Sequence, residues 1–210
     1  MKQGRYLGAP SGSVYAGVFA AGKLTKSHPK ETPLVKIISL AGAAVLALGL
    51  ARAANPDHVK AALDTSTVPV CARCDLTGAD FSRAFMRFAN LYQSDLSGAI
   101  FDRADMAGAF LEETKMDGAR LFRTNASGAQ LNRASLKNAD LREVWLNYAH
   151  LKDADLSGAD LTGAVLSTAQ IQGADLSTVK GLTQAMVNRA CSDGRTKLPP
   201  GIRPSFTCRD

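Results

Sequence analysis

Residues 154–163 read ADLSGADLTG, and the alternation of an alanine with a leucine two residues later decides the fold. This pattern recurs every five residues, with central positions from Leu76 to Leu176, through 21 consecutive units without an insertion. The central position is Leu, Phe, Met or Ile in 20 units, and the position two before it is alanine in 16. Amphipathic helices repeat apolar residues about every 3.6 positions and half-buried strands about every 2. The five-residue period therefore predicts short extended stretches, each burying two side chains, separated by turns.

Four units carry a family resemblance most fully: ADFSR at 79–83, ADLSG at 154–158, ADLTG at 159–163 and ADLST at 174–178. They resemble the A(D/N)LXX signature of pentapeptide-repeat proteins, and the resemblance covers about residues 74–178. It implies an all-β solenoid, a right-handed, quadrilateral (four-sided) parallel β-helix with one unit on each side. The units would make about five coils, with residues twenty apart stacked at roughly 4.8 Å. Stacking is needed because no unit can bury its apolar face alone.

The predicted core consists of the bulky central residues Leu76, Phe81, Leu91, Leu96, Phe101, Leu111, Leu121, Leu131, Leu136, Leu141, Leu146, Leu151, Leu156 and Leu161. Ala126 is the one small central residue and leaves its layer short of volume. Thr124 and Val144 replace the usual alanine nearby, and we interpret their extra volume as compensation. An unfilled layer would be costly, because a Leu-to-Ala cavity costs about 2–5 kcal/mol.

The segment before the repeat predicts export. Ile37–Leu50 is an uncharged apolar run that follows Lys36 and precedes Ala51-Arg52-Ala53, a pattern typical of a secretory signal and its cleavage site. We assign 35–53 as a signal peptide and expect an exported protein, periplasmic or secreted. The run is shorter than the about 20 residues of a membrane span. Without cleavage it would be a signal anchor, the only expected membrane contact. Residues 1–34 are either a disordered leader or a mis-assigned start, with Val35 as the true first residue.

Both ends of the repeat are predicted to carry caps. Residues 54–73 form the N-terminal cap, where Asn55 and Pro56 indicate a short helix to about residue 63. Residues 179–210 form a C-terminal helical cap and tail, with a helix from Leu182 to about Cys191 and an irregular stretch beyond it. The GLTQ at 181–184 and the TKLP at 196–199 resemble caps of exported members of the family.

The four cysteines lie in two pairs, one at each end of the repeat. A disulfide needs Cα atoms within about 7 Å, whereas the predicted rod is roughly 25 Å long. The favoured bond is therefore Cys191–Cys208. Cys71 and Cys74 either form a second disulfide or remain a reduced, inward-facing pair. The same distance argues against a zinc site made from all four.

No motif of a catalytic, metal or cofactor site occurs in the sequence. The aspartates that precede the central residues are expected to make turn hydrogen bonds rather than to act as acids or bases. The lone His150 is expected to be a solvated residue of the solenoid wall.

Two surface features stand out. Arg83, Arg103 and Arg123 share one corner column at twenty-residue spacing, with Glu143 at its end. They either pair with nearby carboxylates (Asp102, Asp105 and Asp140) or form a site for an anion or an acidic partner. The second feature is a set of aromatic residues expected on one outward face, Phe85, Phe88, Trp145 and Tyr148. These residues either anchor an interface or lean over the protein's own surface.

The net charge of +6 is unevenly distributed. Residues 1–54 carry seven Lys or Arg and one acidic residue, whereas 74–178 carry ten basic and fourteen acidic residues. After signal removal no basic patch is strong enough to indicate nucleic acid. We therefore expect a non-catalytic, exported scaffold, binding or structural, with an unknown protein partner and no cofactor. One alternative follows from the resemblance, because some pentapeptide-repeat proteins mimic DNA and modulate gyrase. Another is a metal-assisted hydrolase that uses surface aspartates.

Overall fold

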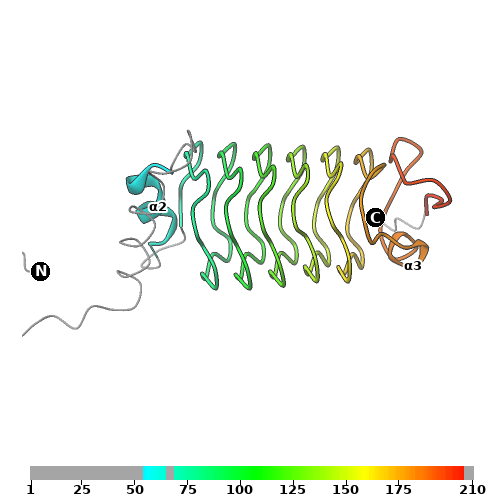
Figure 1. The fold of residues 1–210 in the computed structure, drawn as a ribbon, viewed down its shortest axis with the longest axis horizontal. Coiled ribbons are helices and arrows are strands. Elements are labelled where there is room, and N and C mark those ends of the chain that lie inside the picture. The colour runs from blue at the N-terminus through cyan, green and yellow to red at the C-terminus, as the bar shows by residue number, and fades with distance from the viewer. Residues whose placement is uncertain (1–53, 65–68, 206–210) are drawn as a thin grey trace, which may run out of the picture. The chain divides into compact units, whose positions relative to one another are not determined.

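The computed structural model describes residues 54–64 and 69–205. They belong to one compact unit, Leu50–Asp210. The predicted leader and signal peptide, 1–53, lie outside the described residues. Figure 1 shows the chain wound into stacked coils along one axis, with the helix α2 at one end and α3 at the other.

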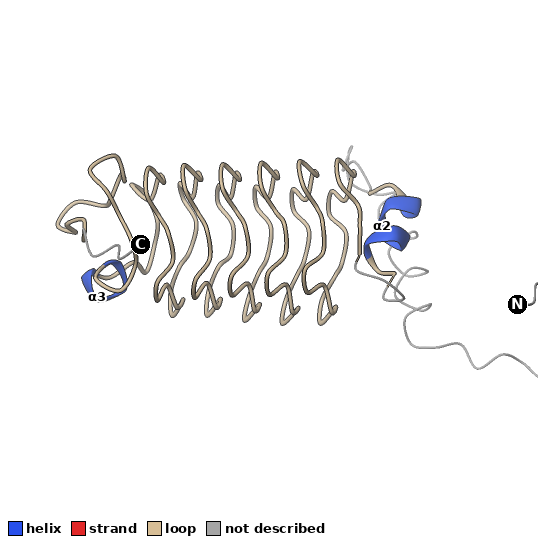
Figure 2. Ribbon diagram, turned by 180° about the vertical axis from the view of Figure 1, so that it is seen from behind, coloured by secondary structure: helices blue, strands red, loops and turns tan. Residues whose placement is uncertain are grey.

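Residues twenty apart pair as parallel bridges in four ladders, which we name after their first residues, Val70, Asp75, Asp80 and Phe85. Each bridge is one residue long, so the coils in Figure 2 carry no strands. Between Asp75 and Asp175 the bridging residue is the one before a central residue. At the Ser135–Asp155 bridge, for example, the Leu136 N–H donates to the Asp155 carbonyl at 2.7 Å. The predicted twenty-residue stacking is therefore confirmed.

The interior is filled by the central residues and the alanines two positions before them. Every predicted core residue is at most 2% exposed. The Phe81 and Phe101 rings stack with centroids 5.1 Å apart. Ala126, Thr124 and Val144 are all fully buried, as the compensation hypothesis requires. The Thr124 hydroxyl donates to the Phe101 carbonyl at 2.5 Å, so its polar group is satisfied inside the core.

The corners of the coils have left-handed backbone. The second residue after the central one has a positive φ, as in Gly98 (65°), Arg83 (61°) and Tyr148 (58°). This conformation costs a side-chain-bearing residue about 1–2 kcal/mol, which explains why glycine is frequent there. Corner side chains such as Arg83 and Tyr148 are exposed.

Helix α2 (Pro56–Ala62) caps the first coil. The Asn55 side chain accepts from the Asp57 and His58 N–H groups and begins the helix. The Asn55 N–H donates to the Asp75 carbonyl at 3.1 Å, and the Asp75 N–H donates to Nδ1 of His58 at 2.9 Å. These two bonds satisfy the open edge of the Asp75 ladder, which would otherwise be available for pairing with another chain.

Helix α3 (Gln184–Val187) begins after Thr183, whose hydroxyl accepts from the Met186 N–H. The predicted helix to about Cys191 was too long. Cys191 instead pairs with Gln170 and extends the Val70 ladder, so its backbone is extended rather than helical. The described stretch after Cys191 is irregular, as expected, except at Lys197, which pairs with Asp175 and extends the Asp75 ladder.

An ion pair fixes this C-terminal cap. Nζ of Lys197 donates to the Asp175 carboxylate at 2.8 Å. This bond, with a second from the Ser177 hydroxyl, lowers the pKa of Asp175 from 3.8 to about 2. Further along, the Gln184 side-chain amide both donates to and accepts from the Arg203 backbone at 2.9 Å. The tail is thus bound to α3 as well as to the last coil.

Cys71 and Cys74 form a disulfide at the start of the repeat. Their Cα atoms are 5.5 Å apart and both side chains are buried. Of the two states left open for this pair, the structure contains the oxidised one. Cys191 is buried, and Cys208 lies outside the described residues, so the favoured Cys191–Cys208 bond stays a prediction. Neither α2 nor α3 has the length and apolar character needed to cross a bilayer.

Candidate functional site

The aspartates before the central residues are used in turns. Oδ1 of Asp155 accepts from the Ser157 N–H at 3.0 Å and from its hydroxyl at 2.6 Å. The same pair of bonds recurs at Asp95, Asp160 and Asp175. The expected turn role is confirmed. Nowhere in the described ranges do three or more His, Cys, Asp or Glu residues group as metal ligands.

Ion pairs cross the flat sides diagonally between residues eighteen apart. Arg87 pairs with Asp105 at 3.6 Å, Arg120 pairs with Asp102, and Lys137 pairs with Asp155 at 3.3 Å. Each ion pair joins the residue after a central position in one coil to the residue before the central position that is stacked on it in the next coil. This spacing places the two side chains on the same side of the solenoid, one coil apart.

The pairing expected for the arginine column is therefore partly wrong. The carboxylates of Asp102 and Asp105 are taken by arginines on the flat sides, and Asp140 pairs with Arg142 at 2.7 Å in its own unit. Only Arg123 is paired within the column, with Glu143 at 2.7 Å. Among the described residues, Arg83 and Arg103 have no ion-pair partner. Their guanidinium groups stand at an exposed corner, away from the flat-side carboxylates.

The most unusual surface is the side that carries the Phe85 ladder, which we call the aromatic face. Four of its aromatic residues are more than half exposed: Phe85 (75%), Phe88 (52%), Trp145 (53%) and Tyr148 (66%). Phe85 and Trp145 are bridge residues of one ladder, three coil steps apart. At about 4.8 Å per step the two aromatic pairs are roughly 14 Å apart.

The middle of the aromatic face is polar, with glycine at its corner positions. Asp105 and Asn125 lie between the two aromatic pairs, and the Asn125 side-chain amide donates to Asp105 at 3.0 Å. The corner positions of these two coils are Gly108 and Gly128. The Phe88 ring lies directly over Gly108, because a Cβ added there would come within 2.5 Å of the ring. The ring thus extends the aromatic surface toward the centre of the face.

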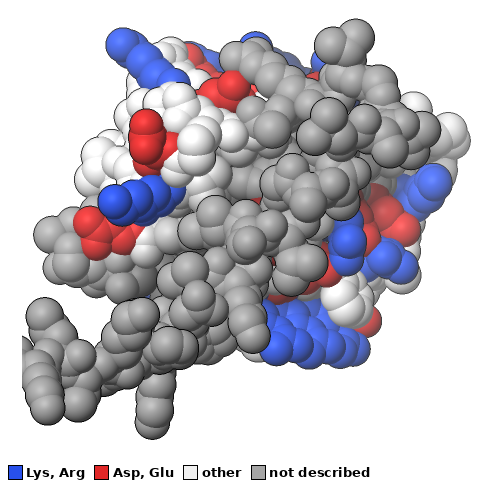
Figure 3. Space-filling view, turned by 60° about the vertical axis from the view of Figure 1, so that its left-hand side comes forward, with Lys and Arg blue, Asp and Glu red and all other residues white. Residues whose placement is uncertain are grey.

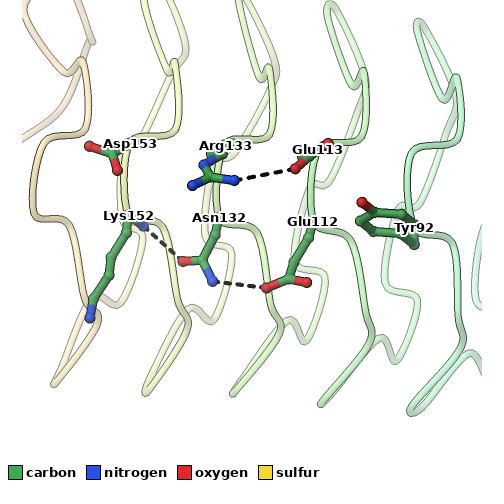
Figure 4. Close-up of a pocket in the computed structure, with 7 residues that line it drawn as sticks. All are labelled: Tyr92, Glu112, Glu113, Asn132, Arg133, Lys152 and Asp153. Atoms are coloured by element: carbon green, nitrogen blue, oxygen red, sulfur yellow. Dashed lines mark hydrogen bonds and ion pairs between the residues drawn. The ribbon is translucent and has the colours of Figure 1, made fainter.

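A hollow lies on the side of the Val70 ladder (Figure 4), with a volume of about 320 Å³. It is lined by Tyr92, Glu112, Glu113, Asn132, Arg133, Lys152 and Asp153. Its side chains bind mainly one another: Asn132 donates to Glu112 at 3.1 Å, and Arg133 contacts Glu113 at 3.4 Å. His150 is half-buried in the same ladder. Such a self-satisfied, mixed-charge surface favours solvation over the binding of a charged ligand.

The sequence analysis gave no role to two residues that the structure uses, His58 in the N-terminal cap and Tyr92 in the hollow. His58 was not given a role, yet its ring closes the first coil, and nothing in the sequence marks a lone histidine in a helix as a backbone acceptor. Tyr92 lines the hollow but lies in an ordinary unit. The diagonal ion pairs could have been found, because an eighteen-residue spacing is readable once the twenty-residue coil is known.

Twenty-residue ladders built from five-residue units with buried alanine and leucine positions define a β-solenoid of pentapeptides. A family model described as pentapeptide repeats matches the chain in eight copies, over residues 71–108, 99–138, 114–147 and 146–180. The chain belongs to the pentapeptide-repeat family, and its fold is the right-handed β-helix solenoid of that family.

Solved structures show the same likeness. A pentapeptide repeat protein (Rfr23) from the cyanobacterium Cyanothece 51142 is 28% identical over 52% of this chain and 63% of its own, with a TM-score of 0.38. One from the Arabidopsis thaliana thylakoid lumen is 27% identical over 53% and 72%, with a TM-score of 0.35. QnrB1, a plasmid-mediated fluoroquinolone resistance protein, is 16% identical over 60% and 78%, with a TM-score of 0.40. The chain thus spans less than two thirds of the Cyanothece protein. No curated protein matches it.

Proposed function

We propose that this chain is an exported, non-catalytic scaffold that binds a protein partner through its aromatic face. The scaffold is a four-sided tube of about five coils, closed by a helical cap at each end, and supports the face rigidly because every coil is bonded to its neighbours. The observation that carries the proposal is the exposure of Phe85, Phe88, Trp145 and Tyr148 on one side.

The energetic argument concerns the exposed rings. Burying a phenylalanine side chain contributes about 1.5–3 kcal/mol, and tryptophan and tyrosine are the side chains that most often dominate protein interfaces. Other wall positions of the repeat are mostly Asp, Asn, Ser, Thr, Arg and Gly. Because rings at more than half exposure remain largely in water, a partner that covers them gains hydrophobic free energy.

Export is supported by two independent features. The apolar run Ile37–Leu50 and the small-residue pattern at 51–53 have the order of a secretory signal. The Cys71–Cys74 disulfide is of a kind that persists in oxidising compartments and is rare in the cytosol. Fractionation of the native host tests this part. A chain recovered from the cytosol with residues 2–34 intact and both cysteines reduced would refute it.

The binding proposal is tested by site-specific photocrosslinking in the native compartment. A benzoylphenylalanine replaces Tyr148 on the aromatic face, and in a matched control it replaces Lys137, which is exposed on the Asp75 side. We expect a discrete protein adduct from position 148 and none from position 137. Equal adducts from both positions, or none from 148, would show that the face is not a docking surface.

The gyrase alternative needs a surface that resembles the charge of DNA. The repeat carries ten basic and fourteen acidic residues, and the described part of the surface in Figure 3 shows side chains of both signs, with a row of basic ones at the lower edge. Paired charges of this kind give a weak net field. We therefore expect no change in gyrase supercoiling at saturating amounts of the chain, and clear inhibition or protection would favour the alternative instead.

A further inference from the structure

The two aromatic pairs are placed symmetrically on their face. Consider a twofold axis that crosses the face midway between Asp105 and Asn125, perpendicular to the solenoid axis. The ladder Phe85–Asp105–Asn125–Trp145 is then mapped onto itself in reverse order. In a dimer of two such faces, Phe85 of one copy meets Trp145 of the other, and Phe88 meets Tyr148. Such an isologous contact presents the same patch on both copies and is the commonest form of homodimer.

The centre of the face suits the same arrangement. Across the axis, Gly108 of one copy lies opposite Gly128 of the other. The Phe88 ring covers the Gly108 corner, and the bare Gly128 corner of the facing copy leaves room for that ring. Asp105 lies opposite Asn125. The Asn125 amide already donates one hydrogen to its own Asp105, and its second hydrogen is available for Asp105 of the second copy. The polar centre is therefore satisfied across the contact rather than left unpaired.

The ends of the corner column carry complementary charges in this orientation. Arg83 and Glu143 occupy the same corner column, three coil steps apart, so the twofold axis places each opposite the other. Arg83 has no ion-pair partner among the described residues, and a carboxylate of the second copy would supply one. Arg103 would lie opposite Arg123, whose charge is compensated by Glu143 at 2.7 Å. A parallel dimer would instead place the Arg83 corner opposite the Phe88 corner of the second copy.

We infer that the partner of the aromatic face is a second copy of this chain, packed antiparallel about that twofold axis. The inference rests on the proposed docking role of the face and names its occupant. The result would be a dimer whose two solenoid axes run in opposite directions. Its two aromatic clusters would each contain four rings, two from each copy.

The test is the mass of the purified full-length chain, measured by sedimentation equilibrium across a range of concentrations. We expect twice the chain mass. Phe85→Ser and Trp145→Ser should each raise the dimer Kd by about tenfold or more, as for interface anchors. Phe110→Ser is the control, because Phe110 is an exposed aromatic (40%) of the Val70 ladder. It should leave the Kd unchanged. Circular dichroism checks that each variant is folded.

Charge reversal tests the orientation. Arg83→Glu alone and Glu143→Arg alone should each weaken the dimer by about fivefold, the range of rim ion pairs. The double variant should recover part of the lost affinity, because the opposed charges at positions 83 and 143 are restored while Arg123 loses the carboxylate that compensates its charge. A dimer that the double variant weakens as much as both single changes together would refute the antiparallel packing.

Two results separate this inference from the proposed function. A chain that stays monomeric up to about 1 mM, where association would contribute only about 4 kcal/mol, refutes the dimer. If the Tyr148 crosslink then still captures another protein, the docking role stands and only its occupant was misidentified. If the crosslink is also absent, both are refuted. A crosslinked adduct of the chain with itself, together with the expected mass, supports both.

Discussion

The clearest quantitative prediction concerns the core layer around Ala126. Replacing Ala126 by leucine adds three heavy atoms to a position that is fully buried, next to Thr124 and Val144, which are also fully buried. Overpacking of this kind costs about 1–3 kcal/mol. For a folded unit of this size, 1 kcal/mol corresponds to a shift of about 2–4 °C in Tm. We expect the Ala126→Leu variant to melt about 2–12 °C lower than the wild type.

Compensation is tested by restoring the usual pattern of the repeat. Thr124→Ala and Val144→Ala together remove four heavy atoms beside the site, and on their own they should cost about 2–5 kcal/mol through the cavity they leave. The Phe101 carbonyl loses the Thr124 hydroxyl but keeps its bond from the Ala104 N–H at 2.8 Å. In the triple variant the leucine fills the space. We expect the triple variant to lie within about 2 kcal/mol of the wild type. This requires a coupling energy of at least about 1 kcal/mol between the two sets of changes, which is in the range seen for contacting residues.

The assay is urea unfolding followed by circular dichroism, with thermal unfolding as a second measurement. Two results would refute the reasoning. An Ala126→Leu variant as stable as the wild type would mean that the layer has spare volume. A triple variant whose loss equals the sum of its parts would mean that Thr124 and Val144 do not fill the space left by Ala126.

The remaining predictions concern the corners, the C-terminal cap and the disulfide. Gly98→Ala should cost about 1 kcal/mol of unfolding free energy from its positive φ alone, since no atom lies within 4 Å of the added Cβ. Gly181→Ala should cost clearly more, because backbone atoms lie 2.5 Å from its added Cβ. Equal urea midpoints of the two variants would contradict this. The folded pKa of Asp175, about 2, is below its ordinary 3.8, so its stabilising effect is present above pH 4 and lost as the pH falls through about 2. Asp175→Asn should flatten that part of the stability curve, and an unchanged acid limb would argue against the ion pair. Cys74→Ala opens a disulfide of sequence separation 3 and should cost about 2 kcal/mol; unfolding free energies compared with and without reductant check it.

The coil architecture could be predicted because the five-residue period never slips. With every unit in register, the twenty-residue neighbours of a residue such as Leu136 follow by counting alone, and the ladders confirm them. The exposure of Trp145 and Tyr148 follows in the same way, because both occupy positions that point away from the core.

The ends and the charges could not be predicted in the same way, because they depend on side-chain reach rather than on phase. Asp102 pairs with Arg120 and not with Arg103. The choice depends on which of the two guanidinium groups extends over the flat side. The tail at Lys197 rejoins the Asp75 ladder after an irregular stretch whose length obeys no period. The acceptor role of His58 depends on the angle at which α2 meets the first coil.

The twenty-residue register also limits how the gene for such a chain can change length. Insertion of one five-residue unit would leave every leucine inside and every corner intact, so the tube would still form. It would, however, rotate everything after the insertion by a quarter turn. An insertion between Phe88 and Trp145 would thus carry Trp145 and Tyr148 onto a neighbouring side, away from Phe85 and Phe88. Only the insertion of whole coils keeps the same side chains on the same surface. Such an insertion would still move the two aromatic pairs apart.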